Sequence, residues 1–358
     1  MKVVQIVPSI SYGDGVSNDC IAIKRALTER GYDTQIYAES ISPKLKRGTA
    51  VPLDKMPEFS EDDVLILHVA SGHHLNFKFD KFSGKKVMRY HNITPPYFFA
   101  GYNRNSQNSC SFGYEGVKYL ADKVDYVIAV SEYNKQDLRR MGYTCDIDVM
   151  PILIPFEDYA QEPDAKTIEK YSDGNPNIVF TGRIVPNKKQ EDVIRAFYLY
   201  KKHYAPGARL FLVGSYQGME RYYERLQDYV RRLGAEDVVF TGHIPFNQIL
   251  AYYRLADVFL CMSEHEGFCI PLLEAMYFHA PVLAYDSSAI AGTLGGSGIL
   301  LKEKNPALTA GWINRLVTDG ELKKMVIEKQ DEHLKEFTYE RIREKLYQCM
   351  DKIIGENR

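Results

Sequence analysis

The sequence contains no apolar run that approaches the 18 residues needed for a membrane-spanning helix. Its charges nearly cancel, with 45 Lys and Arg against 47 Asp and Glu, so no overall field attracts nucleic acid or an acidic membrane. The six cysteines are scattered without paired spacing, which argues against a disulfide framework and against a zinc site. No internal repeat or low-complexity tract interrupts the chain.

The cysteine pattern also bears on the compartment. Unpaired cysteines are typical of a reducing environment. Met1 to Ile10 holds one lysine and a short apolar run interrupted by Pro8, unlike a signal peptide. We therefore expect a cytoplasmic protein, with peripheral contact to the inner face of the membrane as an option if its acceptor is lipid-linked.

Strands and helices alternate along most of the 358 residues, which is typical of parallel α/β sheets covered on both faces. The stretch 153–174 changes to prolines and acids and indicates a linker. We predict a first domain over 1–155, completed by a C-terminal helix over 339–358, and a second domain over 165–338. Predicted strands are 3–7, 34–38, 63–69, 86–90, 124–130, 146–151, 178–181, 209–213, 238–241, 258–262 and 281–285, and predicted helices include 191–203, 219–233, 246–255 and 271–279.

The stretch Ser263 to Met276 is the most informative in the chain. A strand-like run precedes it, and Pro271 suits the first turn of the helix that follows. The free N–H groups and the dipole of that helix favour an anion. Gly267 lets a ligand approach the backbone, while Glu266 and Glu274 flank the helix start. An anion site between carboxylates suits a phosphate that also carries hydroxyl groups, as a sugar nucleotide does.

A second loop supplies positive charge. The predicted strand 178–181 ends in Gly182 and Arg183, and Lys188 follows before the next helix. Arginine offers a planar fork and lysine a mobile point charge for phosphate oxygens. Two solvated loop cations are the alternative, and the nearby carboxylate stretch disfavours it. We leave Lys189 out because it sits one position further along.

Other predicted strand ends carry candidate ligand contacts, because ligands of open α/β sheets bind beyond the carboxyl ends of the strands. His91 follows such a strand directly, and we prefer it to His68 and to the His73–His74 pair. Gly13 and Gly15 lie in a turn that is either a plain tight turn or a loop at the mouth of a cleft. Gly214, His243 and Ile244 end two further strands, where backbone groups can read a base.

The spacing of Asp146 and Asp148 is that of an Asp-x-Asp metal clamp. We reject this interpretation because both residues lie inside a strand-like run rather than in a loop with further oxygen ligands. The sequence therefore predicts no metal site.

Taken together, these motifs resemble those of the retaining glycosyltransferases of family 4. Gly182-Arg183…Lys188 is similar to the phosphate pair of that family, and Glu266-Gly267-Phe268…Glu274 to its Glu-x7-Glu motif. The resemblance covers nearly the whole chain. It implies the GT-B fold, an α/β architecture of two facing Rossmann-like domains with parallel sheets and a cleft between them. The family often has glycine where Cys269 and Lys189 stand here.

The resemblance also implies residue roles. It assigns Arg183 and Lys188 to the donor diphosphate, Glu266 and His91 to the donor sugar, and Glu274 to the ribose. The backbone of Gly267, Phe268, Cys269 and Ile270 would serve the phosphate and sugar, and the Gly13–Gly15 loop would lie near the acceptor.

The expected reaction is transfer of a hexosyl group from a UDP- or GDP-sugar to a hydroxyl of a glycan or lipid-linked saccharide. Retention of configuration follows from the resemblance alone, and we expect no cofactor besides the nucleotide-sugar donor. Polysaccharide or glycoconjugate synthesis is the expected setting. The alternatives are a sugar-nucleotide 2-epimerase, which also has two Rossmann-like domains, and a non-catalytic nucleotide-sugar-binding module.

Overall fold

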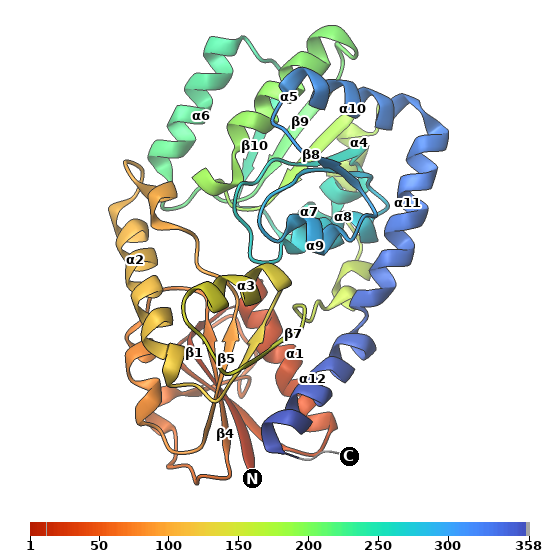
Figure 1. Ribbon diagram of the computed structural model, residues 1–358. Coiled ribbons are helices and arrows are strands. Elements are labelled where there is room, and N and C mark those ends of the chain that lie inside the picture. Colours follow the sequence, from red (N-terminus) through yellow and green to blue (C-terminus); the bar gives the residue numbers. More distant parts are fainter. Residues whose placement is uncertain (12, 356–358) are drawn as a thin grey trace. The chain divides into compact units, whose positions relative to one another are not determined.

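Two parallel β-sheets, each flanked by helices, organise the chain in a computed structural model that describes residues 1–11 and 13–355 (Figure 1). The chain divides into two compact units, one around each sheet. Unit 1 comprises Met1–Pro96, Asn105–Phe156 and Glu336–Arg358, and unit 2 comprises Tyr97–Arg104 and Glu157–Lys335.

The sheet of unit 1 has seven parallel strands in the order β3-β2-β1-β4-β5-β6-β7. The first crossover runs outward from β1 to β2, and the chain then returns to the other side of β1 at β4. This reversal creates a topological switch point between β1 and β4, outside whose carboxyl ends ligands usually bind. The strands are β1 (Lys2–Ile10), β2 (Asp33–Ile41), β3 (Val51–Pro52), β4 (Val64–Val69), β5 (Lys85–Tyr90), β6 (Tyr126–Ala129) and β7 (Asp146–Val149).

Side-chain alternation along these strands divides the core of unit 1 between the two faces of the sheet. Val4 and Leu65 belong to one buried cluster, which includes residues of α2 and α3. Their neighbours Val3 and Val64 belong to the opposite cluster, with residues of α1 and α12. The helices are α1 (Gly15–Glu29), α2 (Arg104–Tyr119), α3 (Glu132–Arg140) and α12 (Tyr339–Ile354).

The C-terminal helix α12 belongs to unit 1, although the helix before it in the sequence, α11, belongs to unit 2. Ile342, Leu346 and Met350 are fully buried against that sheet. Thr338 caps the helix, and Gly355 ends it in a left-handed conformation. Helix α12 thus belongs to unit 1, and 356–358 of the range predicted for it lie outside the described residues.

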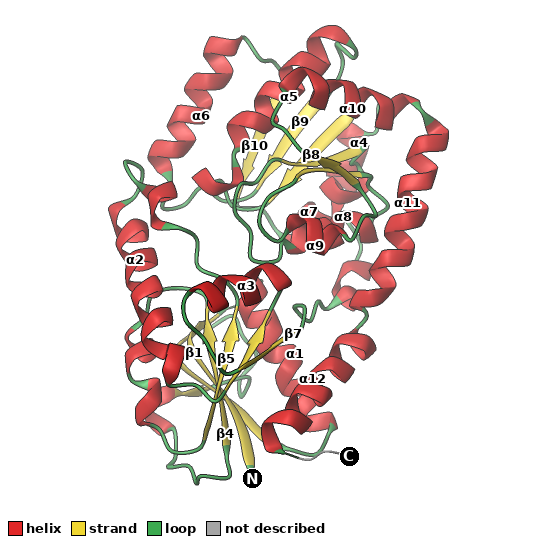
Figure 2. Cartoon of the chain, viewed as in Figure 1, coloured by secondary structure: helices red, strands yellow, loops and turns green. Residues whose placement is uncertain are grey.

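The sheet of unit 2 has six parallel strands in the order β10-β9-β8-β11-β12-β13, with its switch point between β8 and β11. Figure 2 shows β10, β9 and β8 of this sheet side by side in yellow. The strands are β8 (Asn177–Thr181), β9 (Arg209–Val213), β10 (Val238–Gly242), β11 (Val258–Cys261), β12 (Val282–Tyr285) and β13 (Ile299–Leu301). The helices are α4 (Ala165–Tyr171), α5 (Gln190–His203), α6 (Glu220–Leu233), α7 (Phe246–Arg254), α8 (Ile270–Tyr277), α9 (Ile290–Leu294), α10 (Pro306–Thr318) and α11 (Gly320–Leu334).

Part of the predicted linker is helical. Ala165–Tyr171 forms α4, because the Asp164 carboxylate caps it by accepting from the Thr167 amide at 2.9 Å. The boundary between the units lies within the predicted linker but before α4, between Phe156 and Glu157. Helix α8 ends at Tyr277, two residues before the predicted end, and its final turn is followed by His279 with a positive φ of 55°.

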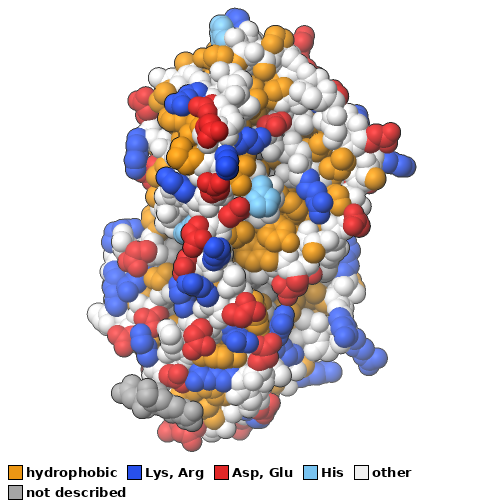
Figure 3. Space-filling view, turned by 90° about the vertical axis from the view of Figure 1, so that its right-hand side faces the viewer, with side chains coloured by type: hydrophobic (Ala, Val, Ile, Leu, Met, Phe, Trp, Pro, Cys, Tyr) orange, Lys and Arg blue, Asp and Glu red, His pale blue; other side chains and the backbone are white. Residues whose placement is uncertain are grey.

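Charges of both signs are interspersed over the face drawn in Figure 3, without a large area of one sign. This distribution on the drawn face agrees with the net charge of −2. Every helix of residues 1–11 and 13–355 is either too short or too polar to cross a bilayer.

Candidate functional site

The loops after β8 and β11 bring together the two stretches that the sequence singles out. These strands are neighbours at the switch point of unit 2, with Ile178 beside Val258. Their carboxyl ends lead into Gly182–Lys188 and Ser263–Cys269, respectively. Residues 78 positions apart in the chain thereby face each other, as the Lys188–Glu266 contact shows.

Lys188 and Glu266 form an ion pair with 2.6 Å between Nζ and Oε1, and their side chains are only 16% and 8% exposed. Burial alone would lower the pKa of Lys188, but the adjacent Glu266 carboxylate outweighs burial and raises it above the usual value. Lys188 therefore keeps its positive charge at the base of the site, where the carboxylate compensates it.

Backbone contacts hold the two loops in register. The Glu264 amide donates to the Asn187 carbonyl at 2.8 Å, and the Asn187 side-chain amide donates to the His265 carbonyl at 3.0 Å. The Glu266 amide donates to the Ser288 hydroxyl at 2.7 Å. Asn187 and Ser288, neither of which stands out in the sequence, thus fix the positions of Lys188 and Glu266.

The remaining cations of the first loop differ in how freely they are available. Arg183 is exposed, and its guanidinium makes a long 3.4 Å hydrogen bond to the Gln217 carbonyl. Lys189 instead pairs with Glu264 at 3.3 Å. The Arg183 guanidinium is therefore held by one long contact, whereas Lys189 is already paired with a carboxylate.

Helix α8 begins at this loop with an unusual cap. Cys269 takes the N-cap position in a left-handed conformation, with φ 74° and ψ 62°, and makes no side-chain capping bond. Pro271 lies in the first turn, as predicted. The first amides of α8 thus have no side-chain acceptor at the N-cap, and they favour an anion. Lys189 is also left-handed, with φ 51°, so both positions where the resembling family has glycine strain an L-residue here.

Two tyrosine hydroxyls hold the carboxylate of Glu274. Its Oε1 accepts from the Tyr159 hydroxyl at 2.8 Å, and its Oε2 accepts from the Tyr253 hydroxyl. Burial raises the pKa of Glu274, and the two tyrosine hydroxyls oppose that shift. Sequence reasoning missed both tyrosines, since they come from other segments and carry no motif.

The carboxyl ends of β8, β9 and β10 approach one another closely at three glycines, Gly182, Gly214 and Gly242. A Cβ on Gly214 would lie 2.0 Å from the Gly182 carbonyl oxygen, so only glycine fits there. Gly214 and Gly242 also form a β-bridge, which links the ends of β9 and β10. Beyond this bridge His243 is exposed and Ile244 is half-buried. The predicted base-binding loops are thus adjacent to the loop of Arg183 and Lys188.

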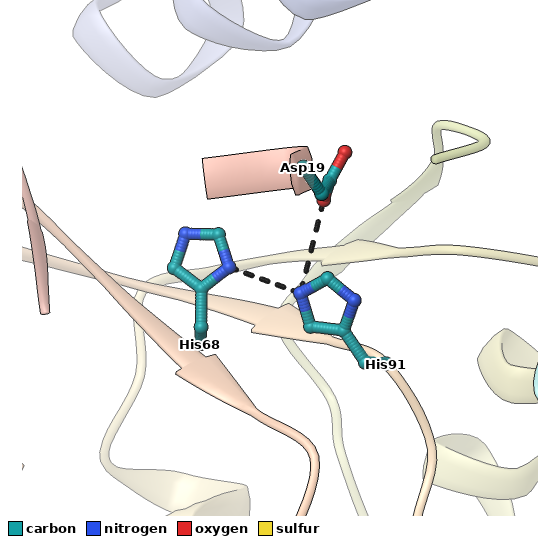
Figure 4. A group of neighbouring side chains, drawn as sticks. All are labelled: Asp19, His68 and His91. Carbon is teal, nitrogen blue, oxygen red and sulfur yellow. Dashed lines mark hydrogen bonds and ion pairs between the residues drawn. The ribbon is translucent and has the colours of Figure 1, made fainter. Parts of the chain in front are cut away.

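In unit 1, His91 follows β5 directly and lies in a buried polar network (Figure 4). Its Nε2 is 3.0 Å from Nδ1 of His68 and 3.7 Å from Oδ2 of Asp19. Asp19 is fully buried and pairs with Arg89 at 2.8 Å. Burial, followed by the charge of Arg89, lowers the pKa of His91 well below its usual value, so the ring is neutral.

The Gly13–Gly15 loop forms the start of α1. Gly13 has φ 82° with open space where a Cβ would lie, and Gly15 is the first helical residue. Between them, Asp14 caps the helix by accepting from the amide and hydroxyl of Ser17. The conformation requires a glycine at 13, and the carboxylate of Asp14 is occupied by the helix start.

Three groups of described residues have ligand-type atoms within 4.8 Å of one another: Asp19, His68 and His91; Glu39, His73 and His74; and Cys261, Glu266 and Cys269. A cation lies beside two of these groups, since Arg89 pairs with Asp19 and Lys188 with Glu266. These fixed positive charges disfavour a metal ion.

The partly exposed group is also poorly suited to a metal. The Leu75 amide points to Nδ1 of His73 at 3.4 Å, and the Glu39 carboxylate occupies Nε2 of the same ring at 2.7 Å. A ligating histidine usually donates from its second nitrogen, which this amide blocks. Asp146 and Asp148 lie within β7, as predicted, and Asp148 pairs with Lys352 at 2.6 Å.

Comparison with known proteins agrees with this geometry. The chain superposes on sucrose-phosphate synthase from Thermosynechococcus elongatus with a TM-score of 0.74 and 17% identity, over 99% of this chain and 100% of that one. HepE from Anabaena, in complex with UDP and glucose, gives a TM-score of 0.70 and 16% identity over 98% and 100% of the two chains. The protein therefore has the GT-B fold of glycosyltransferases.

The sequence similarity is concentrated in unit 2. Residues 162–333 match the family described as glycosyl transferases group 1. A GDP-mannose-dependent α-(1-6)-phosphatidylinositol monomannoside mannosyltransferase from Mycolicibacterium smegmatis is 30% identical over 188 residues. That match covers 51% of this chain and 47% of the relative, so the chain spans about half of the relative's length.

Proposed function

We propose that the protein transfers a hexosyl group from a UDP- or GDP-sugar to a hydroxyl of a glycan or lipid-linked saccharide, with retention and without a metal ion. The observation that carries this proposal is the buried Lys188–Glu266 pair at the start of α8. It sets a fixed cation and a carboxylate side by side at the switch point of unit 2. A diphosphate joined to a sugar presents the complementary groups.

The charge at the leaving group explains why a cation must be fixed there. Breaking the bond between the anomeric carbon and the phosphate oxygen leaves negative charge on the diphosphate. An ammonium group has three donors, so Lys188 can hold Glu266 and a phosphate oxygen at the same time. Arg183 and the first amides of α8 add to this stabilisation, and each preorganised donor contributes roughly 10²–10³ in rate.

The two carboxylates would then divide the sugar and the ribose between them. Glu266 uses Oε1 for Lys188, which leaves Oε2 for a hydroxyl of the donor sugar. Glu274 keeps one lone pair free on each oxygen beside its two tyrosine bonds, so it can accept ribose hydroxyls. The resemblance to family 4 glycosyltransferases supports the same assignment, and it is the sole support for retention.

The names of two similar proteins suggest which donor sugars to test first. The mycobacterial relative is named for GDP-mannose, and HepE is described with UDP and glucose. We therefore propose GDP-mannose and UDP-glucose as the first donors to test. That relative is also named for a phosphatidylinositol mannoside, which supports a lipid-linked saccharide as acceptor.

The proposal requires no metal, because two cations and a helix start balance the roughly two negative charges that a diphosphate carries. Lys188 and Arg183 would supply the positive charge that a divalent ion otherwise provides at a leaving phosphate. Gln217 and Glu266 hold these cations only through single contacts that a ligand can share.

The experiment is a panel of UDP-, GDP- and ADP-sugars in excess EDTA, offered with saccharide and phosphatidylinositol acceptors. Release of UDP or GDP is measured, and the anomeric configuration of the product is read by NMR. Acceptor-dependent release with a retained anomer supports the proposal. Conversion of UDP-N-acetylglucosamine to its manno epimer would identify an epimerase instead. Donor binding without release of nucleotide would identify a binding module.

A further inference from the structure

A row of buried polar side chains crosses three adjacent strands of unit 1 and ends at His91, and Figure 4 shows its last two members, His68 and His91. Gln5 lies in β1, His68 in β4, and His91 follows β5. Gln5 and His68 are 0% and 1% exposed, and His91 is 9% exposed. Polar groups buried to this degree need partners, so the direction of every hydrogen bond in the row can be worked out.

The direction is set at Gln5. Its Nε2 donates to the Cys20 carbonyl at 3.0 Å, so its Oε1 is the atom that faces Nε2 of His68 at 2.9 Å. An amide oxygen can only accept, and Nε2 of His68 must therefore carry a proton. Burial lowers the pKa of His68 well below its usual value, so the ring is neutral and its Nδ1 is an acceptor.

The same logic passes to His91. The acceptor Nδ1 of His68 faces Nε2 of His91 at 3.0 Å, so Nε2 of His91 must donate. Oδ2 of Asp19 lies 3.7 Å from the same nitrogen and favours a proton there. Since His91 is also neutral, its remaining nitrogen, Nδ1, carries a lone pair and no proton.

Nδ1 of His91 is buried and has no hydrogen-bond partner among the described residues. An unpaired buried acceptor is unfavourable and rare, and it calls for a donor from outside the chain. The atom lies just past the end of β5, on the sheet edge where ligands of such folds bind. The hydroxyl of a saccharide is a donor of the right kind.

We propose that Gln5 and His68 are positioning residues that hold His91 in its Nε2–H tautomer, so that Nδ1 accepts a hydroxyl of a reacting saccharide. The identity of the ligand rests on the proposed function, whereas the tautomer does not. The hydroxyl belongs either to the donor sugar or to the acceptor, and the two sources are separated by experiment below.

The first experiment reads the tautomer directly. Long-range ¹H–¹⁵N spectra of the ¹⁵N-histidine-labelled chain show which ring nitrogens carry protons, and a His91→Gln variant assigns the signals of His91. We expect His91 to be protonated at Nε2 and bare at Nδ1. A proton on Nδ1, or a metal-dependent shift of both rings upon adding Zn²⁺, would overturn the inference. The tautomer is read on the wild-type chain, and the His91→Gln variant serves only to assign the signals.

The second experiment tests the positioning role with a matched pair of variants. His68→Gln keeps an oxygen acceptor for His91 and an N–H donor for Gln5, whereas His68→Met keeps no donor and only a weak thioether acceptor. We expect His68→Met to show mixed His91 tautomers and a kcat/KM lowered roughly tenfold, the effect of one lost hydrogen bond. His68→Gln should restore both measures. His279→Gln, at a ring 64% exposed, serves as the control.

Deoxy analogues separate the two sources of the hydroxyl. With the analogue that lacks the contacted hydroxyl, kcat/KM should be the same for the wild type and for His68→Met. Whether that analogue is a donor or an acceptor identifies the source of the hydroxyl. Equal losses in His68→Met and His68→Gln with an unchanged tautomer would refute the positioning role. If the wild type transfers no sugar, the proposed function fails while the spectra still decide the tautomer.

Discussion

Removing one partner of the Lys188–Glu266 pair tests how the site balances charge. At 2.6 Å and an effective dielectric constant of about 20, the attraction between the two charges amounts to roughly 6 kcal/mol. Desolvation offsets part of it, but deleting one partner leaves the other buried and unpaired. We therefore expect Lys188→Met to lower the free energy of unfolding by about 3–5 kcal/mol. Tm should fall by roughly 6–20 °C for a domain of this size.

The double variant separates stability from activity. Lys188→Met combined with Glu266→Gln removes both charges, and it should regain most of the stability that the single change loses. It should regain no glycosyl transfer, because the cation at the leaving group is still missing. Urea unfolding and nucleotide release are the two assays. A double variant no more stable than Lys188→Met would refute the charge-balance reasoning, and near-normal turnover would refute the role of Lys188.

Three further predictions follow from local geometry. Cys269→Gly should be about 1 kcal/mol more stable than Cys269→Ala in urea unfolding, since both lose the thiol but only glycine relaxes the φ of 74°. The neutral, buried His68 has a pKa below its unfolded value, so its contribution to stability is present above pH ~6.5 and is lost as the pH falls. The stability of His68→Gln should therefore decline less between pH 6.5 and 4.5. Gly214→Ala should weaken UDP or GDP binding measured by calorimetry, because its Cβ would meet the Gly182 carbonyl at 2.0 Å, whereas Gly292→Ala, with open space around it, should not.

Short continuous apolar runs, separated by helical stretches, were enough to predict the core strands of both sheets. The runs at Val64–Val69 and Arg209–Val213 are short, continuous and β-rich, and both are strands. The short strands β3 and β13 were missed, since Pro52 interrupts one and glycines precede the other. Edge strands of this kind form through pairing with a neighbour that the local sequence does not reveal.

Helix α2 shows a different limit. Its 16 residues are mostly polar and small, and only Gly113, Gly116 and Val117 are buried. A Cβ on Gly113 would lie 2.8 Å from the Gly72 backbone nitrogen, so close glycine packing adds to the short apolar stripe of Cys110, Tyr114 and Val117. Periodicity cannot detect such a contact.

At the site, motifs identified the residues that carry charge but not those that hold them. Lys188 and Glu266 stand out because of their spacing from strand ends. Asn187 and Tyr253, which fix the loop and the carboxylate of Glu274, are ordinary residues until the fold brings them together. His68 was weighed at its strand end and ranked below His91, because its pairing with His91 depends on strand order.

The direct measurement of the diphosphate site is a comparison of nucleoside diphosphate and monophosphate binding. Calorimetry would compare UDP with UMP, and GDP with GMP, on the wild type and on Lys188→Met in EDTA. If Lys188 holds the β-phosphate, the wild type prefers one diphosphate at least tenfold, and that preference collapses toward one in the variant. An undiminished preference in Lys188→Met, or no nucleotide binding by the wild type, would contradict the account.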